Sequence, residues 1–163
     1  MNTCHLLIMK RWEIGNNFLS GKVLTHQSFD FLGYTFRPRS SRASTGELFV
    51  SFSAAVSRKA LKAMRTKFKE HPMIKRGYSQ SVEELARAVN PIIQGWINYY
   101  GAYCKSAMSS MYDYINEKII QWAKRKYKHL QRRQWRAGRW LRDLYVKNSK
   151  LFAHWCVWSW VAE

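Results

Sequence analysis

Apolar side chains recur at helical spacing through much of this chain, most clearly in the segment that ends at Glu70. Successive residues of an α-helix are turned by about 100°, so residues three or four positions apart share a face. The pattern begins at Ser53 or Ser57 and stops before His71-Pro72, because proline disfavours helical geometry in the residue before it. One stripe of this expected helix holds Ala60, Leu61, Met64 and Phe68. The opposite side holds Arg58, Lys59, Lys62, Arg65 and Lys69.

Four further segments carry helix signals. Ser81-Val82-Glu83-Glu84 is a capping box that opens a short helix. Asn90-Pro91 is expected to start another, with Asn90 as N-cap and Pro91 at the first helical position. Longer helices are expected over residues 106–128 and 132–147. The expected inward residues are Ile93, Trp96, Ile97 and Tyr100, then Met111, Ile115, Ile119 and Trp122, then Ala137, Trp140, Leu141 and Leu144.

The chain has enough apolar side chains to fill a core. Its 163 residues, of which 47% are apolar, suit one compact domain or a small domain with a tail. The segment 95–101, which reads GWINYYG, is bulky and apolar. This composition favours the centre of the core over a ligand site.

A small β element is expected ahead of the helices. Aromatic residues are dense over residues 29–36, and residues 48–52 form a second β-rich run. Two strands joined by a loop are expected, and the loop carries Arg37, Arg39 and Arg42. The predicted fold is therefore mainly α, with a small N-terminal β-hairpin followed by a helical bundle.

These patterns divide the chain into four parts. Residues 1–25 show no clean period and form a weakly specified leader, and residues 26–52 form the β element. Residues 53–155 form the helical domain, and residues 156–163 form a C-terminal tail. The apolar stretch 151–162 is too short to span a membrane, which leaves a docked core segment or a membrane-surface segment.

The charge of the chain predicts a polyanionic partner. Lys and Arg number 28 against 10 Asp and Glu, which gives a net charge of +18 and a pI near 10.2. Nucleic acid is the first candidate, and an anionic membrane surface is the alternative. The cysteines Cys4, Cys104 and Cys156 lie far apart and form no C-x-x-C pair, so neither a disulfide framework nor a zinc site is expected. This fits a reducing, cytoplasmic setting.

Residues 118–142 hold ten Lys and Arg residues and no Asp or Glu. Ordinary exposed helices carry both positive and negative side chains. A long run of positive side chains alone indicates that the protein is usually bound to an anionic partner. On a helix, Trp135 falls between Arg139 and Arg142 in angular position. This arrangement suits phosphate contact with base stacking, and packing of Trp135 against a neighbouring helix fits it as well.

The acidic residues form no catalytic pattern. Asp30, Asp113 and Asp143 are isolated in the sequence, whereas two-metal phosphoryl transfer needs carboxylates that converge on ions about 4 Å apart. Tyr112-Asp113-Tyr114 lacks the second Asp of a polymerase signature and lies in a helical pattern. His154 has no nucleophile or acid beside it and is expected to be buried and hydrogen-bonded. The sequence predicts no catalytic site, no metal site and no cofactor.

The chain resembles the C-terminal third of bacterial group II intron-encoded reverse transcriptases, which are also called maturases. The segment 27–39, QSFDFLGYTFRPR, resembles their last palm motif, and the segment 49–65 is similar to the opening of their maturase-specific domain. The most diagnostic stretch is 81–107, SVEELARAVNPIIQGWINYYGAYCKSA. WAKRKYKHL at 122–130 and LFAHW at 151–155 complete the match in the same order.

In that family this region is the polymerase thumb and maturase domain, a helical surface that binds the intron RNA, helps it reach its splicing-active fold and contacts the template-primer duplex. The resemblance implies an RNA-binding module here, with group II intron RNA or an RNA/DNA duplex as partner and no membrane attachment. The residues expected to contact RNA are Arg37, Arg39, Arg58, Lys59, Lys62, Arg65, Lys69, Lys124, Arg125, Lys128, Arg132, Arg133, Trp135, Arg136, Arg139 and Arg142.

Departures from the family pattern limit what the resemblance implies. The sequence lacks the fingers and most of the palm, including the Y-x-D-D strand. No HNH endonuclease pattern follows Trp155, and Ala54 stands where the family often has proline. The chain is therefore expected not to be an enzyme by itself and to be a truncated frame. One alternative is a thumb that complements a separate palm subunit. Another is a remnant that cannot fold, because loss of the palm exposes Phe29, Phe31 and Phe36.

Overall fold

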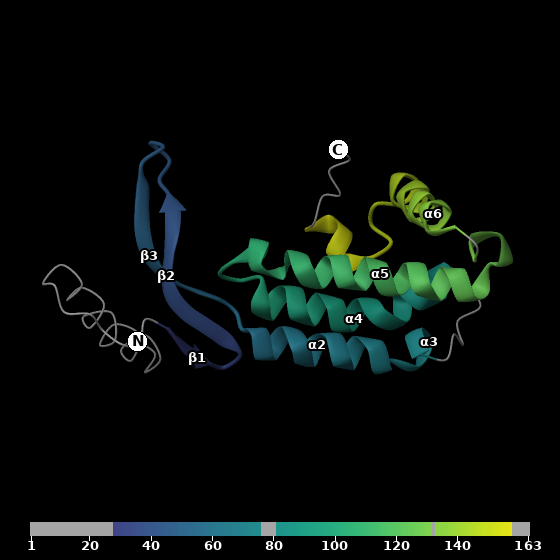
Figure 1. Ribbon diagram of the computed structural model, residues 1–163, viewed down its shortest axis with the longest axis horizontal. Helices are drawn as coiled ribbons and strands as arrows, with labels where there is room; N and C mark the ends of the chain where they lie inside the picture. Colours follow the sequence, from purple (N-terminus) through teal and green to yellow (C-terminus); the bar gives the residue numbers. More distant parts are fainter. Residues whose placement is uncertain (1–27, 76–80, 132, 158–163) are drawn as a thin grey trace, which may run out of the picture. The chain divides into compact units, whose positions relative to one another are not determined.

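The computed structural model describes residues 28–75, 81–131 and 133–157 (Figure 1). They belong to two compact units, the first ending at Ser57 and the second beginning at Arg58. The first unit contains a β-sheet and the second is helical. The predicted class, mainly α with a small β element ahead of a helical bundle, is confirmed.

A three-stranded antiparallel sheet in the order β1-β2-β3 forms the first unit. Its strands are β1 (Phe29–Phe31), β2 (Tyr34–Arg42) and β3 (Leu48–Val56). The sequence predicted two strands, but the aromatic segment folds back on itself at Leu32 and Gly33, where φ is 48° and 82°. Positive φ at both turn positions matches the twist of the flanking strands, and glycine adopts it without steric cost. This two-residue turn separates β1 from β2.

The basic segment predicted to be a loop belongs to β2. Arg37, Arg39 and Arg42 all lie in this strand and pair with β3. Pro38 has no backbone N–H to donate, and it is tolerated because β2 beyond Phe36 pairs with β3 alone. The loop prediction was wrong because the Pro- and Ser-rich composition signals a turn, whereas a strand that is paired on one side accepts these residues.

The strand β3 runs past the predicted end at Phe52 and reaches Val56. Its last residues are buried and pair with the start of β2. The first helix therefore begins at Arg58, which agrees with the predicted start near Ser57 and contradicts the start at Ser53.

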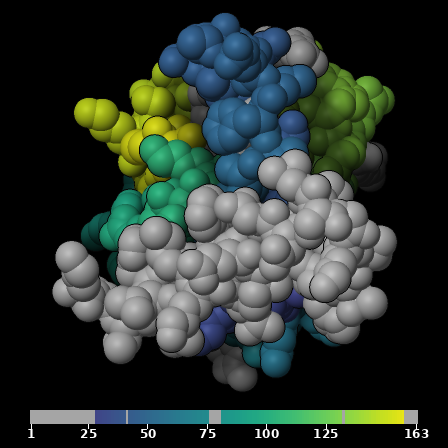
Figure 2. All heavy atoms as spheres, turned by 90° about the vertical axis from the view of Figure 1, so that its left-hand side faces the viewer, coloured from purple at the N-terminus to yellow at the C-terminus, as the bar shows by residue number. Residues whose placement is uncertain are grey.

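The turn end of the β2–β3 ribbon is coloured blue in Figure 2. Apolar side chains at the start of β3 are exposed, and Leu48 keeps 74% of its surface accessible. Tyr34 and Phe36, near the β1 end, are buried. The packed part of the first unit therefore lies around β1 and the adjoining ends of β2 and β3.

The second unit is a bundle of helices around α5. Its α-helices are α2 (Arg58–Glu70), α3 (Pro72–Lys75), α4 (Val82–Tyr100), α5 (Ser109–Lys126) and α6 (Gln134–Lys147). Its 3-10 helices are η2 (Lys105–Met108), η3 (Lys128–Leu130) and η4 (Ala153–Cys156). Contacts from α5 reach α2, α3 and α6, so α5 is the central helix (Figure 1).

The predicted inward faces form the core of this bundle. The four residues predicted for the central helix, Met111, Ile115, Ile119 and Trp122, are all buried. Burial of a large apolar side chain stabilises the folded state by about 1.5 to 3 kcal/mol, so this face holds α5 to its neighbours. The other buried residues from the predicted faces of α2, α4 and α6 are Ala60, Met64, Phe68, Ile93, Ala137 and Leu141. Leu61, Trp96, Ile97, Tyr100, Trp140 and Leu144 are only half-buried.

One continuous helix, α4, replaces the two helices predicted between residues 81 and 101. Ser81 caps it as predicted, and its side chain accepts a hydrogen bond of 3.1 Å from the Glu84 backbone N–H. Asn90 does not cap a second helix, because the helix continues through Pro91. The Asn90 side chain instead binds the backbone of residues 151 and 153, at 2.9 and 3.0 Å. This tertiary contact overrides the local N-cap signal.

The segment 95–101 is not the centre of the core. The buried residues of α4 end at Ile93, and Tyr99 keeps 47% of its surface accessible. Bulky composition predicted burial, but the interior lies beside the first half of α4.

The apolar segment after α6 is docked in the core as far as it is described. Phe152, His154 and Trp155 are buried, and η4 packs on α4. The prediction of a buried, hydrogen-bonded His154 is confirmed, since Nε2 lies 2.8 Å from Asn116 Oδ1. Of the two alternatives for this stretch, the docked one holds for residues 151–156.

Among the residues that the structure describes, no helix has the length and apolar content needed to cross a membrane. The predicted leader, residues 1–25, and residues 158–163 of the predicted tail lie outside the described residues.

Candidate nucleic-acid interface

The exposed side of α2 carries a stripe of four cations. Arg58, Lys62, Arg65 and Lys69 are spaced by four, three and four residues, which places them on one face. The helix has no acidic residue before Glu70, and its buried residues lie on the opposite side. The stripe is therefore held toward the surface by the packing of the apolar face.

The central helix carries a second stripe with the same spacing. Tyr114, Lys118, Gln121 and Arg125 follow one another by four, three and four residues along α5. Because α2 and α5 are in contact, the two stripes border a common groove. We call it the α2–α5 groove.

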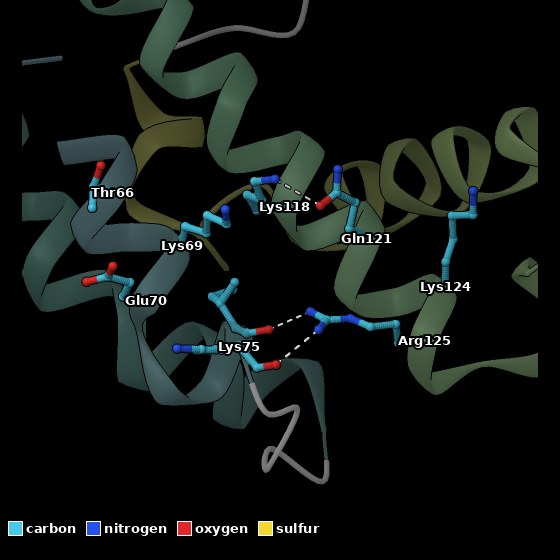
Figure 3. Close-up of a pocket in the computed structure, with 9 residues that line it drawn as sticks. Thr66, Lys69, Glu70, Lys75, Lys118, Gln121, Lys124 and Arg125 are labelled. Carbon is cyan, nitrogen blue, oxygen red and sulfur yellow. Dashed lines mark hydrogen bonds between the residues drawn. The ribbon is translucent and has the colours of Figure 1, made fainter. Parts of the chain in front are cut away.

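The α2–α5 groove consists of two adjoining clefts of about 660 and 500 Å³ that share Thr66 and Lys69. In Figure 3, Lys69 from α2 and Lys118 from α5 extend into the larger cleft from its two sides. A water molecule occupies about 30 Å³ in the liquid, so the clefts have room for much more than one hydrated ion. The charged residues that line them are the cations Arg58, Lys62, Arg65, Lys69, Lys75, Lys118, Lys124 and Arg125, and the acid Glu70.

The ring of Tyr114 brings two cations of the groove together. The Arg65 guanidinium carbon lies 5.6 Å from the ring centroid, and Lys118 Nζ lies 5.0 Å from it. Arg65 also donates to the backbone oxygen of Ser110 at 3.2 Å, so it is fixed to α5. Burial, with the neighbouring Glu117 charge, raises the pKa of the Tyr114 phenol, which therefore stays neutral. Two like charges around one neutral ring create a site that favours an anion.

Arg125 closes one end of the groove. Its Nη1 donates to the Lys75 backbone oxygen at 3.1 Å, and its Nη2 donates to that of Ile74 (Figure 3). The last carbonyls of a helix have no partner within the helix and carry partial negative charge, so a guanidinium stabilises the end of α3. Arg125 thus has a structural role in addition to its charge.

A second group of cations lies on η3, on α6 and at Arg133, which directly precedes α6. Lys128, Arg133, Arg136, Arg139 and Arg142 are all exposed. Trp135 keeps 52% of its surface accessible, and the guanidinium carbons of Arg139 and Arg136 lie 4.9 and 5.5 Å from its ring centroid. Of the two predictions for Trp135, the structure gives an exposed ring among guanidinium groups and not a ring buried against a neighbouring helix. We call Trp135, Arg136 and Arg139 the α6 cluster.

The two groups are joined at one point. Lys124, which lines the groove, donates from Nζ to Gln134 Oε1 at 2.8 Å. Gln134 is the first residue of α6 and precedes Trp135. The groove therefore leads to the α6 cluster.

The structure does not bring all the predicted residues together. Lys59 is exposed on α2 but does not line the groove, and Arg132 lies outside the described residues. Arg37, which is exposed, and Arg39, which is half-buried, belong to the first unit.

The predicted contacts did not include several residues of the groove that could meet a ligand. Lys75, Lys118, Gln121 and Tyr114 line the groove but were absent from the predicted contacts. A signal was present, because the spacing of residues 114–125 repeats that of the basic stripe on α2.

The carboxylates are scattered over the elements. Asp30 on β1, Asp113 on α5 and Asp143 on α6 are all exposed. Asp113 lies in a helix as predicted, which separates the Tyr-Asp-Tyr sequence from a polymerase strand. Within the described ranges, no three His, Cys, Asp or Glu residues gather closely enough to hold a metal ion.

The fold and the groove define a small, mainly helical domain with a cationic surface. Residues 61–142, half of the 163-residue chain, match the family model described as "Group II intron, maturase-specific domain". The chain belongs to this family, and the resemblance to maturases is confirmed for this domain. Comparison with curated proteins and comparison with solved structures each gave no match. The matched region runs from α2 into α6, so it contains all of the groove except Arg58.

Proposed function

We propose that this maturase-specific domain binds group II intron RNA through the α2–α5 groove and the α6 cluster, and assists the folding and splicing of that RNA. The observation that carries the proposal is the groove itself, where eight cationic side chains and one carboxylate, Glu70, are found among the described residues that line two adjoining clefts. RNA that folds into a compact form brings phosphates together, and their repulsion opposes the folding. Cations held in a fixed groove reduce this repulsion and release counterions from the RNA.

In this proposal the chain is a cytoplasmic folding cofactor for RNA and not a catalyst, and it uses no cofactor of its own. The isolated, exposed positions of Asp30, Asp113 and Asp143 support that role. The alternative, a thumb supplied to a separate reverse-transcriptase palm, is not favoured by the family match, which covers the maturase-specific domain. Restored DNA synthesis on mixing with a palm subunit would support it.

Neutralisation of the groove should weaken RNA binding and flatten its salt dependence. The triple change Lys62→Gln, Lys69→Gln and Lys118→Gln removes one cation from each of three places along the groove. Each lost phosphate contact lowers the slope of log affinity against log salt by about 0.9, so the slope should shrink by about 2 to 3. Binding of the full chain to a group II intron RNA is measured between low and physiological salt.

A matched control carries Lys67→Gln, Lys105→Gln and Lys147→Gln, which remove the same charge at exposed positions that do not line the groove. The control should retain most of the slope. Equal slopes for the two triple variants would contradict a specific role for the groove. The splicing rate of the same intron RNA at limiting Mg²⁺ tests the second half of the proposal, since the groove variant should accelerate splicing less than the control.

A further inference from the structure

Trp135 is an exposed tryptophan in a strongly cationic surface. Among the tryptophans of the described residues, it is the one that keeps more than half of its residue surface accessible. It lies on the first turn of α6, opposite the buried Ala137 and Leu141. Trp135 therefore presents an accessible aromatic surface beside the guanidinium groups of Arg136 and Arg139, and this combination suits a ligand with both a base and a phosphate.

The surroundings of Trp135 suit a nucleobase better than a membrane surface. A helix that lies in a membrane interface needs a continuous apolar face, with its cations on the opposite side. On the exposed side of α6, Arg139 and Arg142 lie between Trp135 and Val146, which is 77% exposed. The cations are therefore interleaved with the aromatic ring, as phosphate contact next to base stacking requires.

Gly138 leaves open space one helical turn from Trp135. A Cβ added at this position would meet nothing within 4 Å, so neighbouring side chains do not require a glycine there. Glycine inside a helix lowers its stability relative to alanine. Without a side chain at Gly138, the backbone of α6 stays accessible beside Trp135, so a ligand on the ring can approach it closely.

We propose that Trp135, Gly138 and Arg139 form a stacking site for one unpaired base of the RNA. The proposal rests on the proposed function and deepens it. The groove holds the phosphates of a paired segment, and the Lys124–Gln134 hydrogen bond brings its end to α6, where the chain of the RNA presents a bulged or looped base. The base stacks on the accessible part of the indole ring, the backbone at Gly138 admits it, and Arg139 contacts the adjoining phosphate.

The test uses the full chain and two RNA hairpins that differ at one position. Both carry one bulged nucleotide in the stem, which is 2-aminopurine in one hairpin and an abasic residue in the other. The chain holds eight tryptophans, so the fluorescence of the RNA base and not that of the protein reports stacking. We expect tighter binding of the hairpin with the base, and quenching of its fluorescence on binding.

Trp135→Leu should remove this preference, with a loss of affinity for the base-containing hairpin of between about five-fold and about a hundred-fold. Its affinity for the abasic hairpin and its salt slope should remain. Trp135→Phe, which keeps an aromatic face, should retain part of the preference. Tyr103→Leu, a change at an exposed aromatic residue outside α6, is the matched control and should behave as the unaltered chain.

Gly138→Ala separates stacking from a structural role. The added methyl group should raise the midpoint of thermal unfolding, because it favours the helix, and should weaken binding of the base-containing hairpin alone. A preference for the base that survives Trp135→Leu would overturn the proposal. If the unaltered chain showed no salt-dependent binding of RNA, the proposed function itself would be overturned. The two failures are therefore distinguishable.

Discussion

The hydrogen bonds around Asn116 determine the protonation of a buried histidine. Asn116 Oδ1 lies 3.1 Å from Trp155 Nε1, and an indole N–H can only donate. The amide oxygen therefore faces both rings, and the bond of 2.8 Å to His154 Nε2 requires the proton on Nε2. His154 Nδ1 is buried without a hydrogen-bond partner. Burial lowers the pKa of His154 to about 3, so this side chain is neutral in the folded protein.

This histidine should make the stability of the fold depend on pH. In the unfolded chain the imidazole binds a proton below about pH 6.5, whereas in the folded chain it does so only near pH 3. The contribution of His154 to the free energy of unfolding is therefore fully present above pH 6.5. It falls by up to about 1.4 kcal/mol per pH unit as pH decreases toward 3. Denaturant unfolding between pH 7 and pH 5, above the range in which most carboxylates titrate, measures the slope.

His154→Gln keeps a donor for Asn116 and removes the titration, so the slope between pH 6.5 and pH 5 should become much smaller. A slope remains because burial also lowers the pKa of His71. His129→Gln, at an exposed position, is the control variant for the loss of one histidine. An identical pH dependence of the unaltered chain and His154→Gln would contradict this account.

The Asn90 side chain joins α4 to the last described segment of the chain. Asn90 Nδ2 donates to the Leu151 backbone oxygen, and Asn90 Oδ1 accepts from the Ala153 N–H. The amide thus provides hydrogen-bond partners for one backbone oxygen and one backbone N–H in residues 151–153, a segment that has little regular structure. The segment in turn brings Phe152, His154 and Trp155 into the core.

Asn90→Ala should release this segment from α4. Two hydrogen bonds to half-buried backbone groups are lost, which should lower the free energy of unfolding by about 1 to 3 kcal/mol. Hydrogen exchange of the amides in residues 151–157 should accelerate more than that of α5. Gln94→Ala, an exposed change on the same helix, is the control. Equal protection of residues 151–157 in the two variants would argue against the role of Asn90.

The net charge of +18 on 163 residues opposes folding through repulsion between like charges. The groove concentrates part of this repulsion, because the basic stripe of α2 and the cations Lys118, Lys124 and Arg125 of α5 line the same clefts. Salt screens such interactions over about 8 to 10 Å near physiological ionic strength. An anion bound in the groove would relieve them directly.

The midpoint of thermal unfolding should therefore rise with salt and rise further with RNA. Salt acts by screening, whereas RNA binds the folded chain and shifts the unfolding equilibrium. The triple variant at Lys62, Lys69 and Lys118 should show smaller increases than the control at Lys67, Lys105 and Lys147. Calorimetry in increasing NaCl, with and without intron RNA, provides the measurement. A midpoint that falls as salt increases would rule out repulsion as a significant term.

Some features of the fold depend only on residues that are close together in the sequence. Local periodicity predicted these features. Met111, Ile115, Ile119 and Trp122 follow the helical repeat and are buried, and the Ser81 cap lies where the capping box placed it. The basic stripe on α2 is exposed for the same reason, since an apolar face on one side leaves the other side to solvent.

Tertiary contacts decided the rest, because a repeat identifies the polar face of a helix but not the helix that lies next to it. The groove exists because α5 packs beside α2, which brings Lys118 near Lys69, 49 positions away in the sequence. Asn90 binds the segment at 151–153 instead of capping a helix, and Arg37 lies in a strand because β3 pairs with it. The local pattern of residues predicted the helices α2, α5 and α6, much of their buried faces and the sign of the charge. The packing between distant segments determined where that charge is concentrated.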